Sequence, residues 1–216
     1  MNKTISQTIY NTLKNDIIVG SLQSGIKLKL NILKDKYGVS VSILRETLSR
    51  LASEGFIEAK EQKGFYVSPI SKEDFQEILD LRILIECHAI KVAIENRTDD
   101  WESELVASYH KLRLMEKRIE NEEFDKINEW KTCDRKFHQT IIAGTNSKHL
   151  IELHSLIYDK YLRYQMKVLT FRGDEVLDHQ KLFDAIIIGD IKLSQEILKN
   201  HIIEGFKKTN LDELEK

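Results

Sequence analysis

The stretch that decides the fold of this 216-residue chain is YGVSVSILRETLSRLASEGFIEAKEQKGFYV, residues 37–67. Its apolar residues Leu44, Leu48 and Leu51 recur at the spacing of one helical face, which predicts a helix with a buried side. Ser40 stands just before this helix, where its hydroxyl can accept a hydrogen bond from a free amide of the first turn. A turn followed by an amphipathic helix is therefore expected.

The opposite face of this helix carries small, hydroxylated and basic side chains. At about 100° per residue, that face collects Ser42, Arg45, Ser49 and Ser53. Small polar and basic side chains let a helix enter a groove of DNA and meet phosphates and base edges.

After Gly55 the apolar period changes from helical to alternating. Residues 56–59 (FIEA) and 65–67 (FYV) are predicted to form two short strands. The polar tip between them ends at Gly64, which is free to take a positive φ. A helix followed by a basic-tipped hairpin predicts a winged helix-turn-helix, a DNA-binding module.

Charge is distributed unevenly along the chain. Residues 1–71 contain ten Lys and Arg against six Asp and Glu, whereas the remainder contains 23 against 29. A basic head on an acidic body suits a DNA-reading module attached to a part that avoids DNA.

Composition indicates a cytoplasmic protein that does not enter a membrane. No apolar run approaches the roughly 18 residues of a transmembrane helix, and the first residues lack the apolar core of a signal peptide. The two cysteines, Cys87 and Cys133, make no disulfide framework and are expected to be buried hydrophobes in a reducing compartment.

The single proline, Pro69, marks the predicted domain boundary because it ends the last strand. Ser71-x-x-Asp74 follows, a capping-box-like start to a helix. The predicted domains are a winged helix over residues 1–70 and an all-helical antiparallel bundle over 71–216, which makes the fold mainly α. Helices are expected at about residues 5–19, 31–37, 71–96, 99–120, 123–143, 146–169, 174–188 and 190–211.

Two sets of motifs carry a family resemblance. The first is Ile17-Ile18-x-Gly20, Gly38-Val39-Ser40, Leu44-Arg45-Glu46-Thr47-Leu48-x-Arg50-Leu51, Glu54-Gly55 and Gly64-Phe65-x-Val67. Through these, residues 9–70 resemble the GntR-type winged-helix regulators. The second set is Asp80-Leu81-Arg82-x-x-x-Glu86, Asp134-x-x-x-His138, His179 and His201. Through these, the helical remainder resembles the FCD domain of the FadR-like subfamily. Residues 61–71 (EQKGFYVSPIS) are similar to the branch that controls glutarate and related carboxylic-acid catabolism.

The chain departs from the GntR pattern at the positions that read bases. The family usually carries an arginine directly after Gly-Val-Ser, and here that position is Val41. An acidic and basic pair ahead of the second helix is replaced by Leu30 and Asn31. The resemblance therefore implies DNA binding, but it does not transfer the operator sequence of the relatives.

The predicted DNA contacts lie on the recognition helix and the wing. They are Ser40, Ser42, Arg45, Ser49, Arg50, Lys63 and Gly64. For Arg50 an ion pair with Glu46 or Glu54 is an open alternative, and the serines can equally be cap and surface residues. Because one weakly basic head would hold DNA poorly, a homodimer on a palindromic operator is expected.

Four residues of the bundle are candidate metal ligands. Asp134 and His138 are i and i+4, so both side chains leave the same face of a helix. His179 and His201 lie in apolar patterns of later helices, where buried core histidines are the alternative. The FCD resemblance implies that these four residues bind a divalent cation, and a set without thiolate suits Zn²⁺, Ni²⁺ or Mn²⁺. The other histidines have no such match and are expected at the surface or in packing: His88, His110, His149 and His154.

A small carboxylic acid is the expected effector. Arg82 stands at the inward-facing arginine of the family and can clamp a carboxylate bidentately, although an ion pair with Asp80 or Glu86 is an alternative. Tyr158 and Arg163 on a later helix are the other predicted effector contacts. Nearby tyrosines can equally serve as core residues.

These patterns predict a ligand-responsive transcription factor rather than an enzyme. A repressor is the first expectation, and an activator is an open alternative. One alternative is a regulator with a purely structural metal and another effector, such as an acyl-CoA. A metal-dependent hydrolase is disfavoured, because no glutamate stands one residue from a ligand histidine as a general base.

Replacing Arg45 by Ala is expected to cost about 1–3 kcal/mol of operator affinity, because it removes a phosphate or guanine contact. The measurement is a binding titration of operator DNA at fixed salt. Unchanged affinity would remove Arg45 from the interface.

Overall fold

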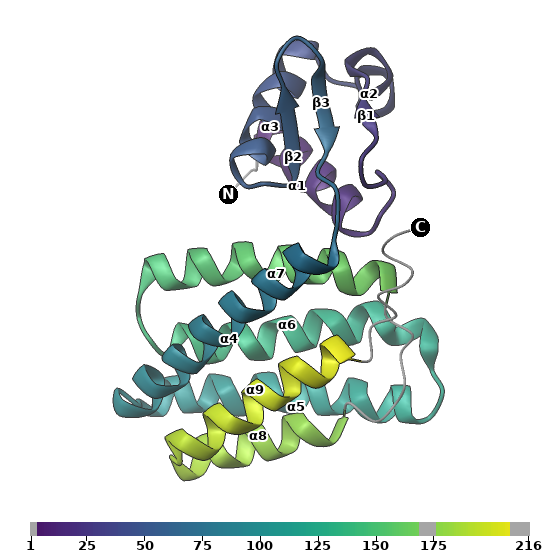
Figure 1. Ribbon diagram of the computed structural model, residues 1–216. Helices are drawn as coiled ribbons and strands as arrows, with labels where there is room; N and C mark the ends of the chain where they lie inside the picture. The colour runs from purple at the N-terminus through teal and green to yellow at the C-terminus, as the bar shows by residue number, and fades with distance from the viewer. Residues whose placement is uncertain (1–3, 169–175, 208–216) are drawn as a thin grey trace. The chain divides into compact units, whose positions relative to one another are not determined.

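The computed structural model describes residues 4–168 and 176–207. Within these ranges the chain divides into two compact units, which are described separately (Figure 1). Unit 1 contains residues 4–75 and Asp159–Val168, and unit 2 contains Gln76–Tyr158 and residues 176–207. Helix α7 (Lys148–Val168) thus contributes its two halves to different units.

The N-terminal part of unit 1 is a winged helix, as expected. Its elements are α1 (Ile5–Ile18), β1 (Lys27–Leu28), α2 (Leu30–Tyr37), α3 (Val41–Ser53), β2 (Ile57–Lys60) and β3 (Gly64–Val67). The antiparallel sheet has the order β1-β3-β2, with β2 and β3 forming the predicted hairpin.

The sequence prediction of two strands was wrong by one. The third strand, β1, places Lys27 opposite Tyr66 and Leu28 opposite Phe65. Two residues are too few to show the alternation that marks a strand, and β1 exists because β3 offers it a free edge to pair with.

Helix α3 has the predicted cap and the predicted buried face. The Ser40 hydroxyl accepts a hydrogen bond from the amide of Ile43. Leu44, Leu48 and Leu51 have no exposed surface. Since these residues fix which side of α3 faces the core, they also fix which side faces solvent.

Unit 2 is built almost entirely of helices, so the mainly α fold class is confirmed. Its helices are α4 (Lys72–Glu95, from Gln76 onward), α5 (Asp99–Glu120), α6 (Ile127–Ala143), the first half of α7, α8 (Val176–Ile188) and α9 (Ile191–Lys207). They pack side by side around a core that includes Leu112, Phe137 and Leu182 (Figure 1). None of the helices in the described ranges is long and apolar enough to cross a membrane.

The largest difference between a predicted and an observed helix boundary in unit 2 is at the start of α6. A separate 3₁₀ turn, Phe124–Lys126, precedes α6, so α6 begins at Ile127 rather than near residue 123. Glu122, with φ of 64°, breaks the helical path ahead of this turn. The predicted helix ends at residues 169, 174–175 and 208–211 lie outside the described residues.

The N-terminus of α4 has the predicted capping box at Ser71 and Asp74, together with one contact that was not predicted. The Ser71 hydroxyl accepts from the Asp74 amide, as in a capping box. The Asp74 carboxylate, however, accepts from the hydroxyl of Tyr164, which itself accepts from the Ser71 amide. A tyrosine from α7 thus completes the box, which a local sequence pattern cannot indicate.

Replacing Leu44 by Ala is expected to lower the free energy of unfolding of the winged helix by about 2–5 kcal/mol, because it leaves a cavity in a closed core. Ile32→Ala is the matched control, because Ile32 lies on α2 with 59% of its surface exposed. That change should stay within about 0.5 kcal/mol. Hydrogen exchange of the α3 amides in the full chain measures both, and equal effects would contradict the assigned core.

Candidate metal centre and nucleic-acid interface

The four predicted metal ligands lie together inside unit 2. Asp134 and His138 project from α6, His179 from α8 and His201 from α9. One ligand atom from each lies within 4.8 Å of the others. Asp134, His138 and His179 are buried, and His201 is half-buried.

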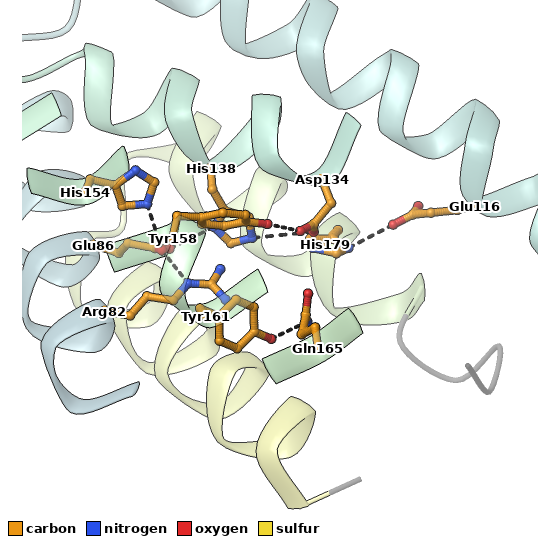
Figure 2. Close-up of polar contacts among 10 residues, drawn as sticks. All are labelled: Arg82, Glu86, Glu116, Asp134, His138, His154, Tyr158, Tyr161, Gln165 and His179. Atoms are coloured by element: carbon orange, nitrogen blue, oxygen red, sulfur yellow. Dashed lines mark hydrogen bonds and ion pairs between the residues drawn. The ribbon is translucent and has the colours of Figure 1, made fainter. Parts of the chain in front are cut away.

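Buried carboxylates orient two of the imidazoles. Glu86 on α4 lies 2.7 Å from Nδ1 of His138, and Glu116 on α5 lies 2.8 Å from Nδ1 of His179. Figure 2 shows both contacts. Because ionised carboxylates can only accept, each Nδ1 donates a proton, so Nε2 is the atom of each ring that can bind a cation once it carries no proton.

Both Nε2 atoms are buried, and neither has a hydrogen-bond partner among the described residues. They face Asp134, whose Oδ1 lies 3.0 Å from Nε2 of His179 and 3.7 Å from Nε2 of His138. The shorter contact lacks hydrogen-bond geometry. Two imidazole nitrogens and a carboxylate oxygen that converge without bonding each other are the donor set of a divalent cation. The residues present therefore fit a metal ion.

Electrostatics hold this cluster in a charged state. Burial would raise the pKa of Asp134, but the contact with His179 and the charge of His138 hold it far below its ordinary value. Burial would lower the pKa of His179, but Asp134 and Glu116 outweigh this effect and raise it to about 10. Burial and the charges of the neighbouring imidazoles lower the pKa of His201.

A second group of polar side chains lies beside the cluster. Nε of Arg82 is 2.6 Å from Oε1 of Glu86, and Nε2 of His154 is 3.0 Å from the same oxygen (Figure 2). Burial would raise the pKa of Glu86, but the charges of Arg82 and His138 hold it well below its ordinary value. The ion pair left open for Arg82 therefore exists, and its partner is Glu86.

Two of the three predicted effector residues lie together. The guanidinium of Arg82 is 4.8 Å from the ring centre of Tyr158, and the Tyr158 hydroxyl donates to Asp134. Arg163 belongs to unit 1 instead, where its guanidinium donates to the carbonyl of Ser68.

Sequence reasoning missed two residues of this site. Glu116 has no solvent exposure and His154 has 1%. Glu116 follows Leu112 and precedes Ile119 at helical spacing, and a charged residue on an apolar face is a usable sign of a buried partner. His154 stands four residues before Tyr158 on the same face of α7, which would have indicated burial.

All seven predicted DNA contacts are exposed, namely Ser40, Ser42, Arg45, Ser49, Arg50, Lys63 and Gly64. Arg45 and Gly64 line a surface concavity of about 520 Å³ that also contains Lys27 and Lys29. These two lysines were not among the predicted contacts. Three cations from β1, the start of α2 and the recognition helix α3 make a basic groove suited to phosphate.

Arg50 lies against α1 rather than in this groove. Its guanidinium carbon is 3.7 Å from the ring centre of Tyr10, and it donates to Gln7. Its Nε is 3.6 Å from Glu54. These contacts support the ion-pair alternative for Arg50, although its side chain stays exposed.

The chain joins a winged helix that carries a basic groove to a helical unit with a buried cluster of possible metal ligands. This combination is typical of one class of protein, the DNA-binding transcription regulators. The family model "Bacterial regulatory proteins, gntR family" matches residues 5–67, and that of the FCD domain matches residues 77–204. The chain belongs to the GntR family and carries an FCD domain. The family expectation from the sequence is confirmed, and the chain is a regulator rather than an enzyme.

Individual relatives agree with this placement. The HTH-type transcriptional repressor GlaR of Escherichia coli is 31% identical over 201 residues, covering 90% of each chain. The uncharacterised regulator BphR of Paraburkholderia xenovorans is 29% identical over 203 residues, covering 93% of this chain and 83% of its own. The solved structure of E. coli McbR/YncC has a TM-score of 0.75 at 22% identity, with 95% and 97% of the chains covered.

Metal binding is expected to release about one proton at about pH 8, because His179, with a pKa of about 10, is protonated in the metal-free protein. The release should fall toward zero as the pH rises through about 10, since the proton has then already left. Zinc titration calorimetry in buffers of different ionisation enthalpy measures it. Zero release at neutral pH while Zn²⁺ still binds would contradict the displacement of a proton from His179.

Proposed function

We propose that this protein is a ligand-responsive transcriptional repressor whose FCD domain binds a divalent metal and a small organic acid. The observation that carries the proposal is the pair of buried, unbonded Nε2 atoms of His138 and His179 aimed at Asp134. Leaving two buried polar atoms without a partner costs free energy, and a bound cation removes that cost.

The metal is Zn²⁺, Ni²⁺ or Mn²⁺, because the donors are imidazole nitrogens and one carboxylate oxygen without sulfur. When bound, it supplies a Lewis-acidic centre with positions open to a carboxylate. Glu86 and Glu116 orient the ligand imidazoles, and Tyr158 orients Asp134. Arg82, whose guanidinium is paired with Glu86, offers a second anchor for an organic acid.

DNA is held by the exposed face of α3, the wing and the basic groove. Arg45 and the serines Ser40, Ser42 and Ser49 meet the major groove, and Lys63 with Gly64 meets the minor groove or its phosphates. Lys27 and Lys29 add phosphate contacts from the groove that they share with Arg45. Their positive charges replace part of the charge that is lost because Val41 stands where the family usually has an arginine.

The protein works as a homodimer in the cytoplasm, where two winged helices read a palindromic operator. Exposed leucines on α4 support self-association: Leu81 and Leu84 have 45% and 67% of their surface accessible. Apolar side chains repeated on one helix face favour burial against a partner.

The metal-loaded protein is expected to bind its operator more weakly when a dicarboxylate such as glutarate or 2-hydroxyglutarate is added, by roughly 5–150-fold. The acid must bind unequally to the two arrangements of the DNA-binding heads to produce this shift. Fluorescence anisotropy of labelled operator, with and without metal, measures it.

Arg82→Gln tests the anchor in the same assay, since it should abolish the acid response while operator binding without acid persists. Thermal shifts with a panel of carboxylic acids complete the test. A panel that changes neither melting temperature nor operator affinity would overturn the carboxylic-acid effector. A response that is the same in metal-free protein would assign the metal a purely structural role.

A further inference from the structure

The carboxylate of Glu86 contacts both a candidate metal-ligand imidazole and Arg82, the proposed effector arginine. Its Oε2 lies 2.7 Å from Nδ1 of His138, and its Oε1 lies 2.6 Å from Nε of Arg82. His154 holds Oε1 from a third side, at 3.0 Å. Only 1% of the surface of Glu86 is exposed to solvent, so bulk water does not compete for these hydrogen bonds.

We infer that Glu86 is a positioning residue that couples the metal centre to Arg82, so that metal binding orders the guanidinium that receives the organic acid. The inference rests on the metal centre of the proposed function. It goes beyond that function by assigning the residue through which the metal governs effector affinity.

The geometry provides a direct path. If Nε2 of His138 holds a cation, the imidazole plane would be restrained, and with it the direction of its Nδ1–H. That hydrogen bond restrains Oε2 of Glu86, and because the carboxylate is planar, it narrows the positions open to Oε1. Nε of Arg82 bonds to Oε1, so the orientation of its guanidinium is restricted in turn. A preorganised guanidinium loses less entropy when it binds a carboxylate.

A competing path runs through Tyr158. The Arg82 guanidinium lies 4.8 Å from the centre of the Tyr158 ring, and the Tyr158 hydroxyl donates to Asp134. The aromatic contact is non-directional compared with the hydrogen bond to Glu86. The two paths make different predictions for substitutions at Glu86 and Tyr158.

The chain supplies a matched control in Glu116. It orients His179 at 2.8 Å with the same chemistry by which Glu86 orients His138. The arginine beside Glu116 is Arg113, whose Nη1 lies 3.6 Å from Oε2 of Glu116, and not Arg82. Glu116→Gln should therefore weaken the metal site, roughly 10–100-fold as for other partners of ligand histidines, without uncoupling it from Arg82.

The experiment follows the Nε–H signal of Arg82 by ¹H–¹⁵N NMR during titration with Zn²⁺, with Arg82→Lys used to identify the signal. In the unaltered protein, saturating Zn²⁺ is expected to slow solvent exchange of this proton by roughly 10-fold or more, as a local opening is suppressed. Glu116→Gln should show the same slowing at higher Zn²⁺ concentration. Glu86→Gln should bind Zn²⁺ without slowing the exchange.

Equal slowing in Glu86→Gln, or none in the unaltered protein, would overturn the inference. If Glu86→Gln does not fold, Tyr158→Phe decides the matter, since it keeps the ring and removes the hydroxyl bond to Asp134. Slowing that survives in Tyr158→Phe supports Glu86, and slowing that disappears assigns the path to Tyr158. A protein that takes up no Zn²⁺ at all would instead defeat the metal centre of the proposed function.

Discussion

A buried carboxylate is stable only when hydrogen-bond donors of the protein replace its hydration. In unit 2, Glu86 is a buried carboxylate with several such donors. Arg82 of α4, His138 of α6 and His154 of α7 each donate to it. Three helices are therefore tied to one acceptor, and a shift of any of them would strand a charge in the interior. The same contacts keep His138 in the tautomer that a metal requires. The hydrogen bonds to Glu86 therefore determine both how these three helices pack and how the His138 imidazole is oriented.

Much of the fold follows from apolar period alone. Leu44, Leu48 and Leu51 predict α3 and its buried side, because a helix of that length repeats its pattern several times. The strand β1 shows the limit of this reasoning, since two residues cannot reveal alternation. Its pairing with β3 is a property of the sheet edge rather than of Lys27 and Leu28 themselves.

The candidate site divides in the same way. Asp134 and His138 can be paired from sequence, because i and i+4 share a helix face. Bringing His179 to them required the family resemblance, since the contact joins different helices. Glu116 and His154 were missed for a related reason: their partners are far away along the chain, and only burial on an apolar face could have signalled them. Distance in sequence, more than chemistry, limited the prediction.

The composition of the donor set has a consequence for oxidative stress. Imidazole and carboxylate ligands contain no sulfur, so peroxide has no thiolate at this centre to attack. The two cysteines of the chain do not change this, because burial and the charge of Glu86 raise the pKa of Cys87 to about 11 and burial raises that of Cys133. Both thiols stay protonated and unreactive near neutral pH. A metal held by these residues, as proposed, would therefore keep its ligands when thiols elsewhere in the cell are oxidised.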